Sequence, residues 1–180
     1  MRKQGNNIAY IDGANLYMGA SHMRWRLDYR RFRVWLEEKH GVSRAYLFLG
    51  LIPKFAALYK SLQEAGFTLV FKETIYDSEG KPKGNCDADL VLQVVRDVYE
   101  SHYGQAVIVS SDGDFASTIA FLMDKKKAKA VVSPHPKEKC SILLKRTSVA
   151  ITYLSEIRSL VEVRKEKAPG ADKTAQGSSS

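Results

Sequence analysis

The feature that most constrains the fold is an apolar run that ends in two closely spaced aspartates. Residues 106–109 are rich in β-branched side chains and bounded by Gly104 and a Ser-Ser-Asp-Gly cluster, which is typical of a buried parallel strand. Apolar residues at helical spacing follow, so Asp112 and Asp114 occupy a strand-to-helix turn. Aspartates in such a turn either favour the helix N-terminus or take part in chemistry, and this segment alone does not distinguish the two.

A second strand is expected to bring another aspartate to the same place. Residues 7–11 form an apolar β-run that leads into Asp12, and Asn15 follows three residues later. The carboxyl ends of parallel strands open on one edge of the sheet, so Asp12 and Asp112 can converge although they lie far apart in the sequence. Convergence favours a functional interpretation, because a capping residue does not require it.

Strand-like and helix-like segments alternate along most of the chain. Strands are expected at residues 7–11, 45–51, 67–76, 106–109, 128–133 and 149–153, with helical segments between them. This alternation predicts an α/β fold of three layers, α/β/α, with a mostly parallel central sheet. The length fits one domain, which we place at residues 1–164. Residues 165–180 are expected to form a disordered tail, because their composition cannot build a core.

The two acids at the head of the central helix, expected from residue 86 to about residue 102, are not equivalent. Asp87 lies three and four residues before Leu90 and Val91, on the apolar face of the helix. Asp89 points about 200° away, together with Gln93 on the polar face. We therefore expect Asp87 to reach the cleft and Asp89 to touch its rim at most.

Charge favours a polyanionic partner. The formal net charge is +8, and residues 162–180 contribute four basic and three acidic side chains, or +1, which leaves +7 for the body. The basic clusters lie at residues 24–26, 30–33, 81–83 and 125–127. Together they favour nucleic acid, although each cluster alone is more typical of a solvated surface.

Several other classes of function are not expected. Cys86 and Cys140 do not make a disulfide framework, and Cys86 is expected to be a small buried residue rather than a nucleophile. The four histidines lack a nucleophile pattern, which argues against histidine-based catalysis. The start of the chain has no signal-peptide core, and no apolar run approaches the roughly 18 residues that would span a membrane. We expect a cytoplasmic protein without a membrane partner, and leave a homo-oligomer open.

Carboxylates gathered at one sheet edge would repel one another unless cations shared the site. The polar residues expected at this edge are Asp12, Asn15, Asp87, Ser110, Ser111, Asp112 and Asp114. Oxygen ligands favour Mg²⁺ or Mn²⁺ over zinc, for which the chain offers no Cys/His spacing.

Three motifs in this order, IDGANL, KGNCDADL and VSSDGDF, resemble the NYN domain, a PIN-like nuclease family, and specifically its LabA-like branch. The resemblance extends from about Ile8 to about Leu160 and implies a PIN-like fold with strand order of about 3-2-1-4-5. It also implies a Mg²⁺-dependent ribonuclease site. The matching positions, which would bind metal or position substrate and water, are Asp12, Asn15, Asp87, Asp112 and Asp114. Gln93 stands where family members often carry an aspartate.

The sequence therefore predicts a metal-dependent ribonuclease acting on single-stranded RNA. The residues expected to bind metal and catalyse hydrolysis are Asp12, Asp87, Asp112 and Asp114, and those expected to contact substrate are Asn15, Ser110, Ser111, Lys83 and Asp89. The alternative is an RNA-binding or regulatory adaptor that keeps the fold without turnover. A haloacid-dehalogenase phosphatase fits less well, because the segment after the first strand lacks the second acid of a DxD pair.

Overall fold

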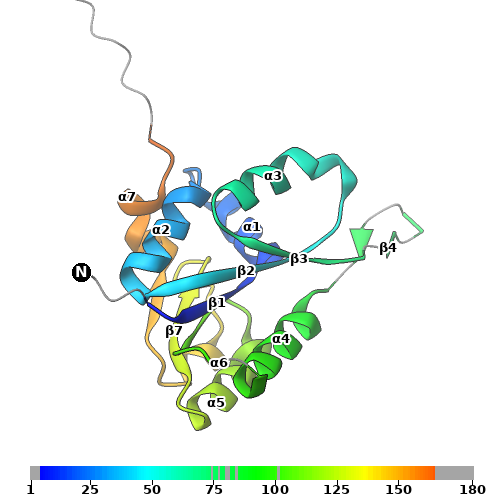
Figure 1. Ribbon diagram of the computed structural model, residues 1–180. Helices are drawn as coiled ribbons and strands as arrows, with labels where there is room; N and C mark the ends of the chain where they lie inside the picture. The colour runs from blue at the N-terminus through cyan, green and yellow to red at the C-terminus, as the bar shows by residue number, and fades with distance from the viewer. Residues whose placement is uncertain are drawn as a thin grey trace, which may run out of the picture.

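The computed structural model describes residues 5–73, 75–76, 78–79, 82–83, 85–100 and 102–164, with the backbone alone for residues 75–76 and 82–83. Its centre is a six-stranded sheet in which every neighbouring pair is parallel (Figure 1). The strands are β1 (Asn7–Asp12), β2 (Val42–Gly50), β3 (Thr68–Lys72), β6 (Ala106–Val109), β7 (Ala128–Ser133) and β8 (Ile151–Tyr153). Their order is β3-β2-β1-β6-β7-β8, or 3-2-1-4-5-6 by position in the chain. The predicted α/β fold and strand order are confirmed, with a sixth strand at the edge.

Helices connect the strands and begin at the residues that the sequence signals. They are α1 (Gly13–His22), α2 (Tyr29–His40), α3 (Ala56–Glu64), α4 (Asp87–Glu100), α5 (Ala116–Asp124), α6 (Ile142–Lys145) and α7 (Arg158–Val161), with 3₁₀ turns η1 (Pro53–Phe55), η2 (Gly113–Phe115) and η3 (Leu154–Ile157). The Asp28 side chain accepts a hydrogen bond from the Arg31 amide, and Gly41 ends α2 with a φ of +65°. None of the helices in the described ranges is long and apolar enough to cross a membrane.

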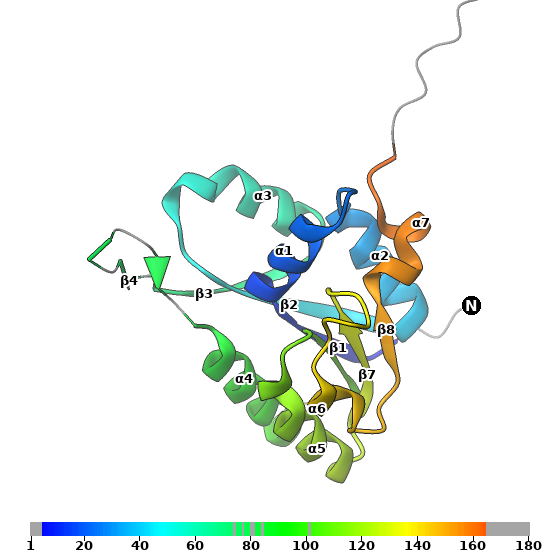
Figure 2. The same cartoon turned by 180° about the vertical axis from the view of Figure 1, so that it is seen from behind.

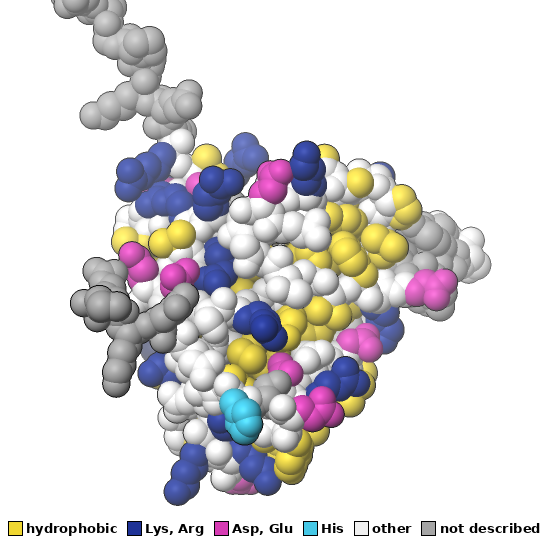
Figure 3. All heavy atoms as spheres, in the orientation of Figure 1, with side chains coloured by type: hydrophobic (Ala, Val, Ile, Leu, Met, Phe, Trp, Pro, Cys, Tyr) yellow, Lys and Arg dark blue, Asp and Glu magenta, His cyan; other side chains and the backbone are white. Residues whose placement is uncertain are grey.

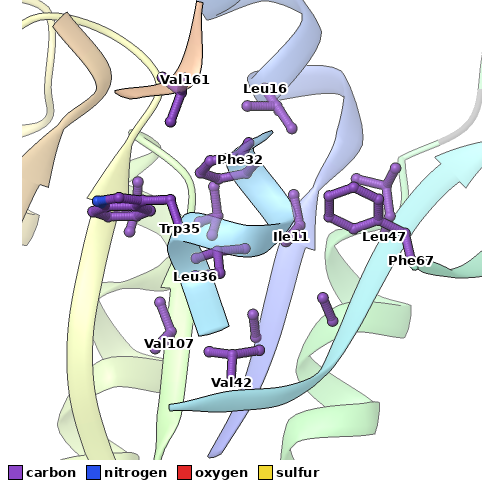
Figure 4. Packing of buried hydrophobic residues seen from close by; sticks show 14 of the residues in the cluster. Ile11, Leu16, Phe32, Trp35, Leu36, Val42, Leu47, Phe67, Val107 and Val161 are labelled. Atoms are coloured by element: carbon purple, nitrogen blue, oxygen red, sulfur yellow. The ribbon is translucent and has the colours of Figure 1, made fainter. Parts of the chain in front are cut away.

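The helices cover both faces of the sheet, because successive strand residues point to opposite sides. Ala9 and Ile11 belong to a core that α1, α2, α3 and α7 close. Ile8 and Tyr10 belong to a second core, closed by α4, α5 and α6. Figures 1 and 2 show the two groups of helices on either side of the sheet. Figure 4 shows the first core, in which Trp35 and its neighbours on α2 pack over β1 and β6.

The predicted third strand, over residues 67–76, is wrong in length. β3 pairs with β2 as far as Lys72 opposite Gly50, where β2 itself ends, so the chain leaves the sheet there. Residues 75–76 instead form β4 (Ile75–Tyr76), which pairs antiparallel with β5 (Pro82–Lys83). The predicted tail, residues 165–180, lies outside the described residues, so the domain boundary at residue 164 stays a prediction.

The strand order creates a crevice beside β1. The chain proceeds from β1 through β2 to β3 on one side, and through β6 and β7 to β8 on the other. Connections therefore leave the carboxyl ends of β1 and β6 toward opposite faces of the sheet, which opens a binding crevice at that point in α/β folds. Asp12 is the last residue of β1, and Asp112 follows β6 by three residues.

Candidate metal centre

Three carboxylates from two distant segments meet above the carboxyl ends of β1 and β6. Asp87 is the first residue of α4, Asp112 precedes η2, and Asp114 lies within η2. Each offers an oxygen atom, and these oxygens all lie within 4.8 Å of one another. We call Asp87, Asp112 and Asp114 the carboxylate trio. Such closeness of like charges is the arrangement that a bound cation stabilises.

Asp12 lies beside the trio and is buried, with 8% of its surface exposed. Its Oδ1 accepts a hydrogen bond from the Asn15 amide at 3.0 Å, and its Oδ2 accepts one from the Ser110 hydroxyl at 3.2 Å. Burial raises the pKa of Asp12, and the negative charges of Asp87 and Asp112 raise it further against those hydrogen bonds. Asp12 therefore shares the electrostatic environment of the trio, and a cation there would favour its ionised form.

Asp112 performs the capping role and also belongs to the trio. Its Oδ1 accepts a hydrogen bond from the Asp114 amide at 3.0 Å, which begins η2. Its own amide donates to the Ser110 hydroxyl at 3.2 Å, and that hydroxyl in turn donates to Asp12. Ser110 is fully buried and links the two aspartates. The site that was expected at this sheet edge is thus tied together by a side chain from the strand end itself.

The two acids at the head of α4 have different partners. Asp87 joins the trio, and its amide donates to Oδ1 of Asn85 at 2.7 Å, which fixes the start of the helix. Asp89 is half-buried and forms an ion pair with Lys72, with Nζ and Oδ2 3.0 Å apart. Sequence reasoning missed Asn85, although an asparagine within two residues of a helix start is a capping signal.

Asn15 and Ser111 join α1 to the end of β6. Oδ1 of Asn15 accepts a hydrogen bond from the Ser111 amide at 2.9 Å. The Ser111 hydroxyl lies 3.0 Å from the Ser133 hydroxyl and accepts from the His135 amide at 3.1 Å, so it is held within the carboxyl edge of the sheet. Ser111 is 5% exposed, and its contacts make it part of the frame of the site. The side chain of Lys83, expected to contact substrate, lies outside the described residues.

The spacing of Gln93 had suggested the polar face of α4, but its side chain points toward a buried partner. Its Nε2 donates to Oδ1 of Asp97 at 2.9 Å, and Oδ2 of Asp97 accepts from the Tyr10 hydroxyl at 2.8 Å. Asp97 is 4% exposed and shares the inner face of α4 with Leu90 and Val94. Gln93 therefore supports the packing of α4 on β1, because the helix presents the Asp97 stripe to the sheet.

The donors present suit a hard divalent cation. The oxygen atoms of the trio and of Asp12 are the ligand type that Mg²⁺ and Mn²⁺ prefer. The neighbouring thiol is a poor alternative ligand or nucleophile, because burial, followed by the charge of Asp89, raises the pKa of Cys86 to about 11. Cys86, which was expected to be buried, is only partly buried and packs against the second core.

The sequence and the fold of this chain are each similar to known proteins. A sequence model of the NYN domain matches residues 8–154, which include all four aspartates. The fold is similar to the crystal structure of a protein of unknown function from Vibrio parahaemolyticus, with a TM-score of 0.67 and 21% sequence identity over 86% of this chain and 96% of that one. At that identity the likeness shows the fold alone. No match was found among curated proteins.

Proposed function

Because the chain belongs to the NYN domain family, whose members are generally nucleases of PIN-like fold, we propose that it is a metal-dependent ribonuclease that hydrolyses RNA phosphodiester bonds. The observation that carries this proposal is the carboxylate trio, assembled beside the buried Asp12 at the crevice of a parallel sheet. The net charge of +8 supports a polyanionic substrate.

The trio and Asp12 would hold one or two divalent cations. When bound, such a cation supplies charge stabilisation and activates water for hydrolysis. Asp87 and Asp112 are half-buried and Asp114 is exposed, and each offers an oxygen atom to such a cation. Hydrogen bonds from Asn15 and Ser110 orient Asp12, so its carboxylate is held in one rotamer beside the trio. Ser110, Ser111 and Asn15 keep these groups in place. The side-chain NH₂ group of Asn15 is a donor of the kind that a phosphate oxygen accepts.

We further propose the finer assignments that the motifs suggest. These are membership of the LabA-like branch, Mg²⁺ as the ion with Mn²⁺ as a substitute, single-stranded RNA as the substrate and the cytoplasm as the location. The oxygen-only donor set supports the choice of ion.

The test is cleavage of an end-labelled single-stranded RNA by the purified protein with Mg²⁺, Mn²⁺ or EDTA. We expect cleavage with either ion and none in EDTA. Asp112→Asn should abolish cleavage while the fold is retained, because it removes a ligand and relieves repulsion within the trio. Asp124→Asn is the matched control, since Asp124 is exposed at the far end of α5. This variant should cleave RNA as the wild type does.

Two outcomes would contradict the proposal. Undiminished cleavage in EDTA would refute metal dependence. Tight RNA binding without cleavage under every ion condition would identify the chain as a non-catalytic adaptor that retains the fold.

A further inference from the structure

A cavity of about 590 Å³ opens directly beside the carboxylates. Asp12, Asp87 and Asp112 are among its lining residues, and most of its other walls come from α1, β2, η1 and α3. Its volume lies within the range of cavities that bind small ligands, about 300–1,000 Å³. The metal centre and this cavity are therefore one continuous space, and an occupant of the cavity would lie next to the reacting group.

The walls of the cavity are apolar and partly rigid. The Tyr59 hydroxyl accepts a hydrogen bond from the Ile52 amide at 3.0 Å and donates to the Gly50 carbonyl at 3.1 Å, which fixes its ring. Around the mouth, large apolar side chains remain exposed: Tyr17 at 65%, and Phe55 and Leu58 at 40% each. Figure 3 shows apolar side chains gathered on the α3 and β3 side of the molecule. Exposed apolar surface of this kind marks a binding site.

A positive charge accompanies the aromatic rim. Nζ of Lys54 lies 5.1 Å from the centroid of the Phe55 ring, and both residues belong to η1. An occupant that fits this space must therefore combine three properties. It presents a group to the carboxylate end and a flat or apolar body to the Tyr17 and Phe55 side of the cavity. It also carries negative charge near Lys54, which neighbours Phe55 without lining the cavity. A nucleotide unit, with its base, ribose and phosphate, has all three.

We infer that this cavity binds an unstacked nucleobase adjacent to the phosphodiester that the carboxylates address, which gives a physical basis for the single-stranded RNA substrate proposed above. The inference rests on the proposed RNA substrate. A base in a duplex is stacked and paired, and cannot enter a cavity beside its own phosphate without leaving the helix. A base that is already unpaired enters without that cost, and stacking on an aromatic side chain is tolerant of base identity.

The experiment compares RNA with and without bases. Fluorescein-labelled octamers of uridine and of abasic ribose phosphate are titrated with protein in EDTA, so that binding is measured without cleavage, alongside a blunt RNA duplex. We expect the wild type to bind the uridine octamer on the order of tenfold more tightly than the abasic octamer. It should also bind the uridine octamer more tightly than the duplex.

Tyr17→Ala and Phe55→Ala should each reduce this base-dependent ratio severalfold while leaving affinity for the abasic octamer nearly unchanged. Tyr99→Ala is the matched control, because Tyr99 is 67% exposed and Tyr17 is 65% exposed. Tyr99 lies twelve residues along α4 from Asp87, about 18 Å away. It should preserve the ratio.

Equal affinity for the uridine and abasic octamers would overturn the inference, as would an equal effect of Tyr17→Ala and Tyr99→Ala. Neither result bears on hydrolysis, which the Mg²⁺ cleavage assay measures separately. Cleavage without base dependence would remove the cavity's role and leave the nuclease in place. Base-dependent binding without cleavage in Mg²⁺ or Mn²⁺ would support the cavity and refute the nuclease.

Discussion

A single carboxylate can cap a helix and bind a cation, because its two oxygen atoms present lone pairs in several directions. Asp112 illustrates this at the candidate centre: one oxygen accepts from the Asp114 amide, and the side chain still belongs to the trio. Capping and metal binding are therefore not alternatives for a residue at a strand end. The cap instead restricts the rotamer and prepares the carboxylate for the ion.

Asp87 and Asp89 should differ in their importance for cleavage. Asp87→Ala removes a member of the trio and should abolish metal-dependent cleavage. Asp89 is paired with Lys72, so Asp89→Ala should lower the rate modestly, by about tenfold, or about 1.4 kcal/mol of transition-state stabilisation. Initial rates on labelled RNA under saturating Mg²⁺ measure both. A larger loss for Asp89→Ala than for Asp87→Ala would contradict this assignment.

His40 should make stability depend on pH below neutrality. Its ring is 7% exposed and packs edge-on against Trp35, with centroids 5.0 Å apart. Burial, together with the charges of Lys129 and Lys39, lowers the pKa of His40 from 6.5 to about 4. Folding thus favours the neutral ring, so its contribution to stability is complete above pH 6.5 and is lost as the pH falls toward 4. The loss at pH 5 relative to pH 7.5 should be about 2 kcal/mol.

Urea unfolding at pH 7.5 and pH 5.0 checks this contribution. His40→Phe should lose about 2 kcal/mol less than the wild type over this interval, because it cannot be protonated. His102→Gln serves as control, since His102 is exposed, and should lose as much as the wild type. An identical pH dependence for His40→Phe and the wild type would refute the role of His40.

At the scale of elements, the position of α1 depends on a glycine that faces a turn. A Cβ at Gly19 would lie 2.5 Å from Cβ of Pro134 and 2.7 Å from its carbonyl carbon, atoms that cannot move aside without a backbone shift. Helix propensity alone predicts that Gly19→Ala stabilises the protein by about 1 kcal/mol. Overpacking costs about 1–3 kcal/mol and should prevail, so we expect net destabilisation in urea unfolding. A stabilised variant would show that the turn at Pro134 yields.

Sequence reasoning located most elements because each carries its own signal. β6 and β7 occupy the residues that their apolar runs predict, and Asp28 and Gly41 at the ends of α2 are residue types that favour helix termini. The break after Lys72 carries no such signal, because it is set by the end of the neighbouring strand β2. The inward position of Gln93 was missed for a similar reason, since its partner Asp97 is a buried acid that an apolar pattern cannot reveal.

The candidate site shows the same division. Strand-end aspartates and helical phase are local features, so Asp12, Asp87 and Asp112 could be brought together from the sequence. The cavity beside them could not, because its walls come from several elements whose apolar residues look like ordinary core residues in the sequence. The ion pair between Lys72 and Asp89 likewise joins two elements and has no sequence signature.

At the scale of the whole molecule, not every basic cluster is available to RNA. Arg31 donates to the backbone carbonyls of Glu162 and Ser159, and Arg33 donates to those of Gly66, Val42 and Ser43. These two arginines therefore hold α2 in place rather than form a free basic surface. The lysines at 125–127 precede β7 and lie at the amino edge of the sheet, opposite the aspartates. Exposed Lys54 and Lys139 follow β2 and β7, at the carboxyl edge.

RNA affinity should accordingly depend on salt concentration, mainly because of the basic residues at the carboxyl edge of the sheet. The logarithm of the association constant should fall linearly with the logarithm of salt concentration. Lys54→Ala combined with Lys139→Ala should reduce this slope by about two, whereas Lys125→Ala combined with Lys126→Ala should leave it nearly unchanged. Removal of residues 168–180 should also have little effect, because their net charge is small. Fluorescence anisotropy across a salt series measures all four proteins. An equal reduction of the slope for both lysine pairs would show that RNA does not bind mainly at the carboxyl edge.

The most direct test of the account is calorimetric titration of the metal-free protein with Mn²⁺, because the central claim is that these carboxylates form one cation site. The wild type should bind Mn²⁺, and Asp12→Asn and Asp112→Asn should each weaken binding by at least about tenfold. Asp124→Asn, remote from the site, should bind as the wild type does. Absence of binding to the wild type, or equal affinity in all four proteins, would contradict the account.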